Sequence, residues 1–237
     1  MTSLYTLNDI ATELQGLDPE LVAYSLCQAA SMSLNAERYE DACAIMKYRV
    51  KMCNWPISEY ERLLFTTGYK NLISKQRQSF SHFARKADPS IPPLVRQYQS
   101  LLLLEALRMC DECITIILSD LLPTAATPRA SITFLKTLAD MYRYRGEFVA
   151  GDSLRLSRAY YEKALRQCDE AALGPADPLR LTCASHAAVL LSELCGQREE
   201  GLALLSRAFD AAVSAVETLP AAAYRDATLA LQLMRAN

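Results

Sequence analysis

Apolar residues recur at helical spacing along almost the whole chain. Between residues 198 and 217, for example, leucine, phenylalanine, alanine and valine form one stripe and the charged residues lie off it. Few glycines or prolines interrupt such stretches. The pattern predicts nine main helices, over residues 18–33, 37–53, 58–86, 92–121, 129–146, 152–173, 178–195, 198–217 and 221–236. Residues 3–16 are expected to form a short extra helix or a tail.

Local signals support the helix starts. The segment from Ser58 to Glu61 has the composition of a capping box, and Pro92 and Pro93 suit a first helical turn. The apolar runs 101–104 and 114–118 resemble strands, but they lie in a long stretch without a breaker, which favours buried helix. Short connections favour antiparallel neighbours. The sequence therefore predicts an all-α fold, an α-solenoid or stacked helical hairpins, and not a parallel α/β sheet.

Composition limits the function. The chain has 237 residues, is 51% hydrophobic and carries a formal net charge of −2. Because the broad basic field of nucleic-acid binders is absent, we expect no nucleic-acid partner, and any anion site must be local. No apolar run approaches the roughly 18 residues that span a bilayer, so we expect no membrane insertion. The N-terminus lacks the basic and apolar regions of a signal peptide, so we expect a cytoplasmic protein.

Eight cysteines are scattered through amphipathic stretches. The closest pair is Cys110 and Cys113, but a zinc site needs further ligands, and the chain has only two histidines, His82 and His186. We therefore expect reduced, mostly buried thiols, no metal and no cofactor.

Two short stretches place cations and hydroxyls inside helical apolar patterns. Lys70 and Arg77 are seven residues apart, about two helical turns, so they share one face of a helix. Arg143 and Tyr144 add a guanidinium and a phenolic donor from a second helix. Such a set suits a phosphate dianion, because charge-assisted bonds from guanidinium are strong and directional. Ion pairs within the protein or a solvated helix face would explain the same residues.

Several motifs occur in an order that resembles one known family. They are Ala36–Asp41 (AERYED), Tyr69–Asn71, Tyr142–Tyr144, Gly151–Asp152, Asp177–Leu181, Ala208–Asp210 and Tyr224–Leu229. The chain resembles the 14-3-3 family of dimeric adaptors that bind phosphoserine and phosphothreonine. The resemblance covers about residues 18–237 and implies a single domain of nine antiparallel helices after an N-terminal extension, 1–17. In that family two protomers form a cup with two amphipathic grooves.

The resemblance implies roles for particular residues. Lys70, Arg77, Arg143 and Tyr144 match the four residues that hold the phosphate. The positions that match the peptide groove are Lys136, His186, Val189, Glu193, Leu229, Leu233 and Asn237. For Val189, Leu229 and Leu233, an ordinary place in the core remains an alternative.

The chain departs from the family pattern near the implied site. Gln76 and Ser81 stand where the family commonly has arginines, so the phosphate pocket is expected to be less positive. His186 replaces an asparagine that holds the ligand backbone, and Ser185 replaces the adjacent leucine. A histidine can donate a hydrogen bond, but its geometry and charge differ from those of asparagine.

The resemblance also implies a dimer, either a homodimer or a heterodimer with a paralogue. The matching interface positions are Arg38, Asp41, Ser79, Tyr98, Leu101 and Glu105. Leu101 replaces a lysine that pairs with the residue matched by Asp41, and a surface ion pair contributes only about 0–1 kcal/mol. Phosphorylation of the serine matched by Ser79 weakens the family dimer.

The sequence thus favours a non-enzymatic adaptor in signal transduction that binds phosphorylated client proteins. A tetratricopeptide-like scaffold for unmodified peptides is the first alternative, although no 34-residue repeat extends along the chain. An all-α enzyme is the second, but no catalytic motif is present. Asp140 and Glu147 could share a helix face, where pairing with Lys70 and Arg143 is their simplest role.

Overall fold

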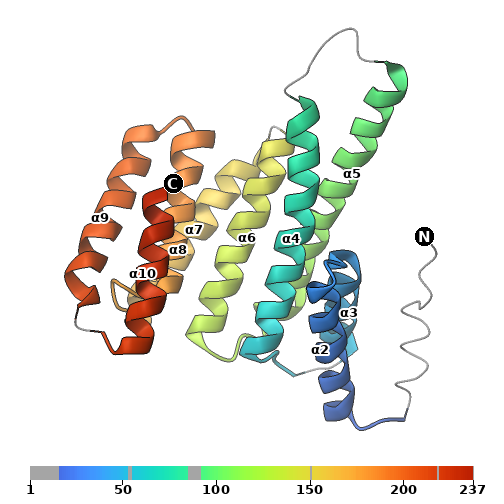
Figure 1. Cartoon of the computed structure of the whole chain (residues 1–237), viewed down its shortest axis with the longest axis horizontal. Coiled ribbons are helices and arrows are strands. Elements are labelled where there is room, and N and C mark those ends of the chain that lie inside the picture. Colours follow the sequence, from blue (N-terminus) through green and yellow to red (C-terminus); the bar gives the residue numbers. More distant parts are fainter. Residues whose placement is uncertain (1–15, 53–54, 85–91, 150, 218, 237) are drawn as a thin grey trace. The chain divides into compact units, whose positions relative to one another are not determined.

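The protein is described here by a computed structural model that covers residues 16–52, 55–84, 92–149, 151–217 and 219–236 (Figure 1). These residues form nine α-helices and no strand, and two of the helices continue into a π-helical turn. The elements are α2 (Pro19–Asn35), α3 (Tyr39–Met52), α4 (Glu59–Ala84), α5 (Pro93–Ile116) with η1 (Ile117–Leu121), α6 (Pro128–Phe148), α7 (Ser153–Glu170), α8 (Pro178–Val189) with η2 (Leu190–Leu194), α9 (Arg198–Val216) and α10 (Ala221–Ala236). The predicted all-α fold is confirmed.

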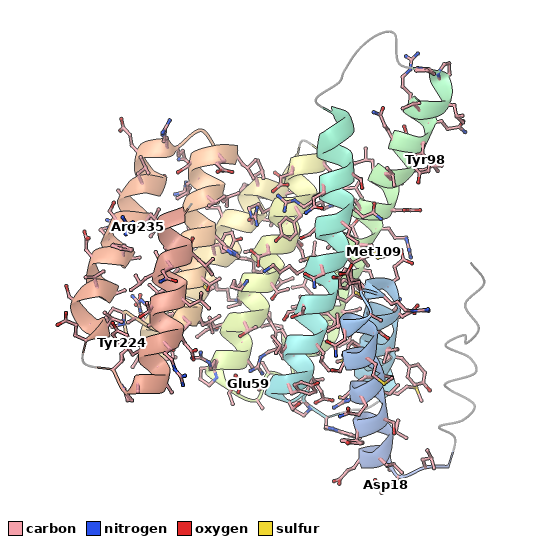
Figure 2. All side chains as sticks on the ribbon, in the orientation of Figure 1. Asp18, Glu59, Tyr98, Met109, Tyr224 and Arg235 are labelled. Carbon is pink, nitrogen blue, oxygen red and sulfur yellow. The ribbon has the colours of Figure 1, made fainter. Side chains whose placement is uncertain are left out.

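The predicted helix ends lie within three residues of the observed ends when η1 and η2 are counted with α5 and α8. The capping box at the start of α4 is formed: the Ser58 backbone N–H donates to Glu61 Oε2 over 2.6 Å, and the Glu61 N–H donates to Ser58 Oγ over 3.2 Å. Asp18 caps α2 in a similar way, accepting from the Glu20 N–H at 2.8 Å. Figure 2 shows Asp18 and Glu59 at the starts of α2 and α4. Almost all of the segment 3–16 lies outside the described residues.

The chain divides into two compact units, Met1–Ala125 and Ala126–Asn237. In the first unit α2 packs on α3, α3 on α4, and α4 on α5, and Figure 1 shows α4 and α5 running in opposite directions. The fully buried side chains of this unit include Met46, Phe65, Tyr69 and Ile73. The apolar stripes of the sequence thus meet one another between consecutive helices.

In the second unit α6 packs on α7, α7 on α8, and α10 on both α8 and α9. One core cluster joins Leu181 of α8 to Leu231 and Met234 of α10. Gly201 lets α9 approach its neighbour closely, because a Cβ there would stand 2.2 Å from Ser192 Oγ and 2.7 Å from the Ala188 carbonyl oxygen. The sequence predicts a single domain over residues 18–237. The division into two compact units does not test this, so it stays a prediction.

Within the described residues no helix is both long and apolar enough to cross a membrane. The same residues contain no group of three or more acidic, histidine or cysteine side chains that could hold a metal ion. None of the seven described cysteines forms a disulfide, and six of them are buried.

Candidate functional site

A buried carboxylate organises the polar residues of the second unit. Asp140 on α6 accepts a hydrogen bond from the Tyr161 hydroxyl at 2.5 Å and contacts His186 Nδ1 at 2.8 Å, both through Oδ1. Its Oδ2 accepts from Lys136 Nζ at 2.6 Å. Burial by itself disfavours both charges, but their attraction holds the pKa of Asp140 well below its usual range and raises that of Lys136. Two predicted groove residues, Lys136 and His186, are thus joined through one carboxylate.

The same contact indicates which nitrogen of His186 carries the proton toward Asp140. An ionised carboxylate can only accept hydrogen bonds, so Nδ1 must carry the proton that bonds Asp140. In the neutral imidazole the other nitrogen, Nε2, then bears a lone pair. His186 is partly exposed, and in this neutral form Nε2 would offer an acceptor where an asparagine amide would offer a donor and an acceptor. The ring lies edge-on to Tyr161, with centroids 6.5 Å apart.

The predicted pair Arg143 and Tyr144 lies one turn further along α6. The Arg143 guanidinium carbon lies 4.5 Å from the centroid of the Tyr144 ring, a cation–π arrangement. Arg143 Nη1 bonds Glu147 Oε1 at 3.0 Å, as the spacing of four residues predicts. Arg143 is only 8% exposed, and among the described residues its Nε is a buried donor without a hydrogen-bond partner.

The other predicted phosphate ligands belong to the first unit. Lys70 is exposed and Arg77 half-buried, and both project from α4. The structure therefore presents the four residues as two pairs, one on α4 and one on α6, each within its own unit. Gln76 Nε2 lies 3.5 Å from Glu105 Oε2, and the side chain of Ser81 lies outside the described residues.

The remaining groove candidates differ in exposure. Val189 and Glu193 line a cavity of about 290 Å³ between α8, η2 and α9. Leu229 and Leu233 are 59% and 61% exposed, while the opposite face of α10 packs into the core. The alternative that Leu229 and Leu233 are ordinary core residues of this unit is therefore wrong. Asn237 lies outside the described residues.

The predicted interface residues lie on the first unit. Arg38 and Asp41 form an exposed ion pair with each other. Tyr98 and Leu101 project from the N-terminal half of α5 and are 59% and 52% exposed; Figure 2 labels Tyr98. Ser79 Oγ donates to the Lys75 carbonyl oxygen at 3.1 Å.

Sequence reasoning missed the central role of Asp140 and gave Tyr161 no role in the site. Asp140 was expected to pair with Lys70 or Arg143, whereas its ion pair is with Lys136. The spacing of four residues between Lys136 and Asp140 was an available signal. No local signal connects Asp140 with Tyr161 and His186, which are 21 and 46 residues away.

Comparison with known proteins agrees with the all-α fold. The sequence model described as "14-3-3 protein" matches residues 29–237. The 14-3-3 protein beta/alpha-A of Xenopus laevis is 31% identical, and the match covers 90% of each chain. The 14-3-3-like protein B of Glycine max is 30% identical, with 94% of each chain covered.

These matches define the class as all-α, non-enzymatic adaptors. The chain belongs to the 14-3-3 family. Membership supports a phosphopeptide-binding adaptor or regulatory role and the binding of client proteins.

Proposed function

We infer that the chain binds phosphoserine- or phosphothreonine-containing segments of client proteins, with the phosphate held by Lys70, Arg77, Arg143 and Tyr144. The observation that carries this proposal is the state of Arg143. Its guanidinium is buried, lies against the Tyr144 ring and forms an ion pair with the carboxylate of Glu147. A phosphate oxygen that competes with Glu147 for Nη1 gains a charge-assisted bond to a guanidinium already oriented by packing.

The rest of the proposed groove consists of side chains that can contact a peptide. Leu229 and Leu233 offer exposed apolar surface to residues beside the phosphate. Val189 and Glu193 border a cavity. His186 Nε2 offers an acceptor to a backbone N–H of the ligand, and Lys136 lies beside it on the shared carboxylate.

The proposal includes a dimer that acts in signal transduction in the cytoplasm. Tyr98 and Leu101 expose apolar surface on α5, which a partner subunit could cover. The described cysteines are mostly buried and form no disulfide, which fits a reducing compartment. A dimer would hold two phosphorylated segments at once and gain affinity from effective concentration.

The first test is a fluorescence-anisotropy titration with a peptide of sequence Arg-Ser-x-pSer-x-Pro and its unphosphorylated twin. We expect only the phosphopeptide to bind. Arg143→Ala should weaken binding about 10- to 100-fold, since a hydrogen bond to a charged group contributes about 1.5–3 kcal/mol. Arg155→Ala is the matched control, because Arg155 is an exposed arginine whose ion pair is with the nearby Asp152.

Equal binding of both peptides would refute phosphate recognition and favour a scaffold for unmodified segments. Sedimentation analysis tests the dimer separately. Leu101→Asp should shift the protein toward the monomer by placing a charge in an apolar contact, and Ser79→Glu should shift it less. An unchanged mass for both variants would contradict the proposed interface.

A further inference from the structure

A second concave site lies in the first unit, away from the residues discussed above. It is a cavity of about 420 Å³ bounded by α2, α3, the first turn of α4 and the segment before it. Its lining includes a guanidinium, two carboxylates and three aromatic rings, from Arg49, Glu20, Glu61, Tyr24, Trp55 and Tyr60. Pockets for small ligands typically have about this size and combine apolar walls with a few polar groups.

Arg49 is the unusual member of this set. It is only 1% exposed, and its Nε bonds Glu61 Oε1 at 2.5 Å. Its guanidinium carbon lies 5.0 Å from the centroid of the Trp55 ring. Among the described residues, Nη1 is buried and has no hydrogen-bond partner. An unmet buried donor is costly, so its presence on Arg49, a residue that lines the cavity, favours a ligand that supplies an acceptor.

The charges of the lining restrict that ligand. Glu61 already compensates the Arg49 guanidinium, and it is held in place because its other oxygen caps α4 through the Ser58 N–H. Burial by itself raises the pKa of Glu61, but the hydrogen bonds from Ser58 and the charge of Arg49 hold it below its ordinary value. Glu20 adds a second carboxylate, so the lining carries one guanidinium and two carboxylates. Because the carboxylates outnumber the guanidinium, the lining disfavours an anionic ligand. The suitable acceptor for the Arg49 donor is therefore an uncharged oxygen.

The aromatic side chains restrict the shape of the ligand. Trp55 is 40% exposed, and Tyr24 and Tyr60 also expose large parts of their rings. Aromatic rings that border a partly apolar cavity favour a flat ligand, which can pack against them face to face or edge to face.

We propose that this cavity binds a small, flat, uncharged aromatic ligand whose carbonyl oxygen accepts a hydrogen bond from Arg49 Nη1 while its ring packs against Trp55. Neither phosphate recognition nor dimerisation is needed for this binding, so the inference stands or falls independently of the function proposed above.

Trp55 makes the proposal measurable, because it is the only tryptophan in the chain. Its indole N–H therefore gives a single side-chain resonance in a ¹H–¹⁵N correlation spectrum of the full chain. The probe is nicotinamide, an aromatic amide, and the comparison is nicotinate, the same ring with an anionic carboxylate. We expect a saturable shift of the indole resonance with nicotinamide and at least threefold weaker binding of nicotinate.

Two variants test the geometry. Arg49→Lys keeps the charge but replaces the guanidinium by an ammonium group, so the donor Nη1 is lost. This change should weaken nicotinamide binding at least fivefold. Because this buried change could also impair folding, Ala23→Phe provides a second test: Ala23 lines the cavity, and a ring there should block the probe. Ala29→Phe, on the same helix but not in the lining, is the matched control and should leave binding unchanged.

Three results would overturn the proposal. The first is the absence of a saturable shift at 20 mM nicotinamide, a concentration chosen because fragments of this size bind at about millimolar Kd. The second is tighter binding of nicotinate, which would make the cavity an anion site. The third is unchanged nicotinamide binding in a folded Ala23→Phe variant.

Discussion

Each unit of the molecule buries an acid–base cluster, and the two clusters differ in how completely their polar atoms are used. In the second unit, Asp140 receives hydrogen bonds from Tyr161, His186 and Lys136. In the first unit, Glu61 is also fully engaged, but its partner Arg49 retains a buried nitrogen without a hydrogen-bond partner among the described residues. The second unit also holds a buried donor without a partner among the described residues, Arg143 Nε, but it lies one turn along α6 from Asp140, whereas the donor without a partner in the first unit belongs to the ion pair itself, on a residue that lines a cavity.

The largest effect is expected from Asp140→Asn. The change leaves the Lys136 ammonium, which is largely buried, without its counter-charge, and should lower the free energy of unfolding by about 3 kcal/mol. Chemical denaturation at pH 7 measures the loss. Asp152→Asn, which alters an exposed ion pair, is the control and should change stability by less than about 0.5 kcal/mol.

The pH dependence of this variant sharpens the test. Because the pKa of Asp140 is lowered in the fold, its contribution is complete above the pKa of an unfolded aspartate, about 3.9, and is lost as the pH falls through the folded value. The stability difference between the wild type and Asp140→Asn should therefore shrink below about pH 4. A difference that is constant from pH 7 to pH 3 would mean that the charge of Asp140 is not what stabilises the cluster.

The next largest effect is expected from Glu61→Gln in the other cluster. The amide keeps one acceptor but loses the charge that compensates Arg49, and the free energy of unfolding should fall by about 2 kcal/mol. Glu59→Gln, at an exposed position in the same turn, should have almost no effect. A loss for Glu61→Gln as small as that of its control would show that the Arg49 cluster contributes little.

The smallest effect is expected from His186→Phe. It removes one of the three donors to Asp140 and should cost about 1–2 kcal/mol in unfolding experiments, because the other two donors remain. His186→Asn keeps a short donor and should cost less. If the His186→Phe variant were as stable as the wild type, the hydrogen bond from His186 to Asp140 would not contribute to stability. The role of His186 would then be limited to ligand binding.

Sequence periodicity was enough to predict the helices, because each amphipathic helix carries its own apolar stripe. Local spacing was also enough for the capping box at Ser58 and for the pair Arg143–Glu147, since both connect residues three or four positions apart. It was not enough for Asp140, whose partners Tyr161 and His186 come from two other helices. The places of Leu229 and Leu233 were also ambiguous, because a spacing of four residues suits a core face and an exposed face of a helix equally. In the structure the opposite face of α10 packs into the core, so these two leucines are exposed.

The sequence by itself determined the all-α class, the helix boundaries and, through its ordered motifs, membership in the 14-3-3 family. Only the tertiary structure decided that His186 contacts Asp140 through Nδ1 and that Arg49 is buried with a nitrogen, Nη1, that has no hydrogen-bond partner among the described residues. Helix formation depends on residues within about one turn of each other, and the sequence gives these neighbours directly. The protonation and hydrogen bonding of a buried side chain depend on groups brought to it by other helices, and these become known only when the helices are packed.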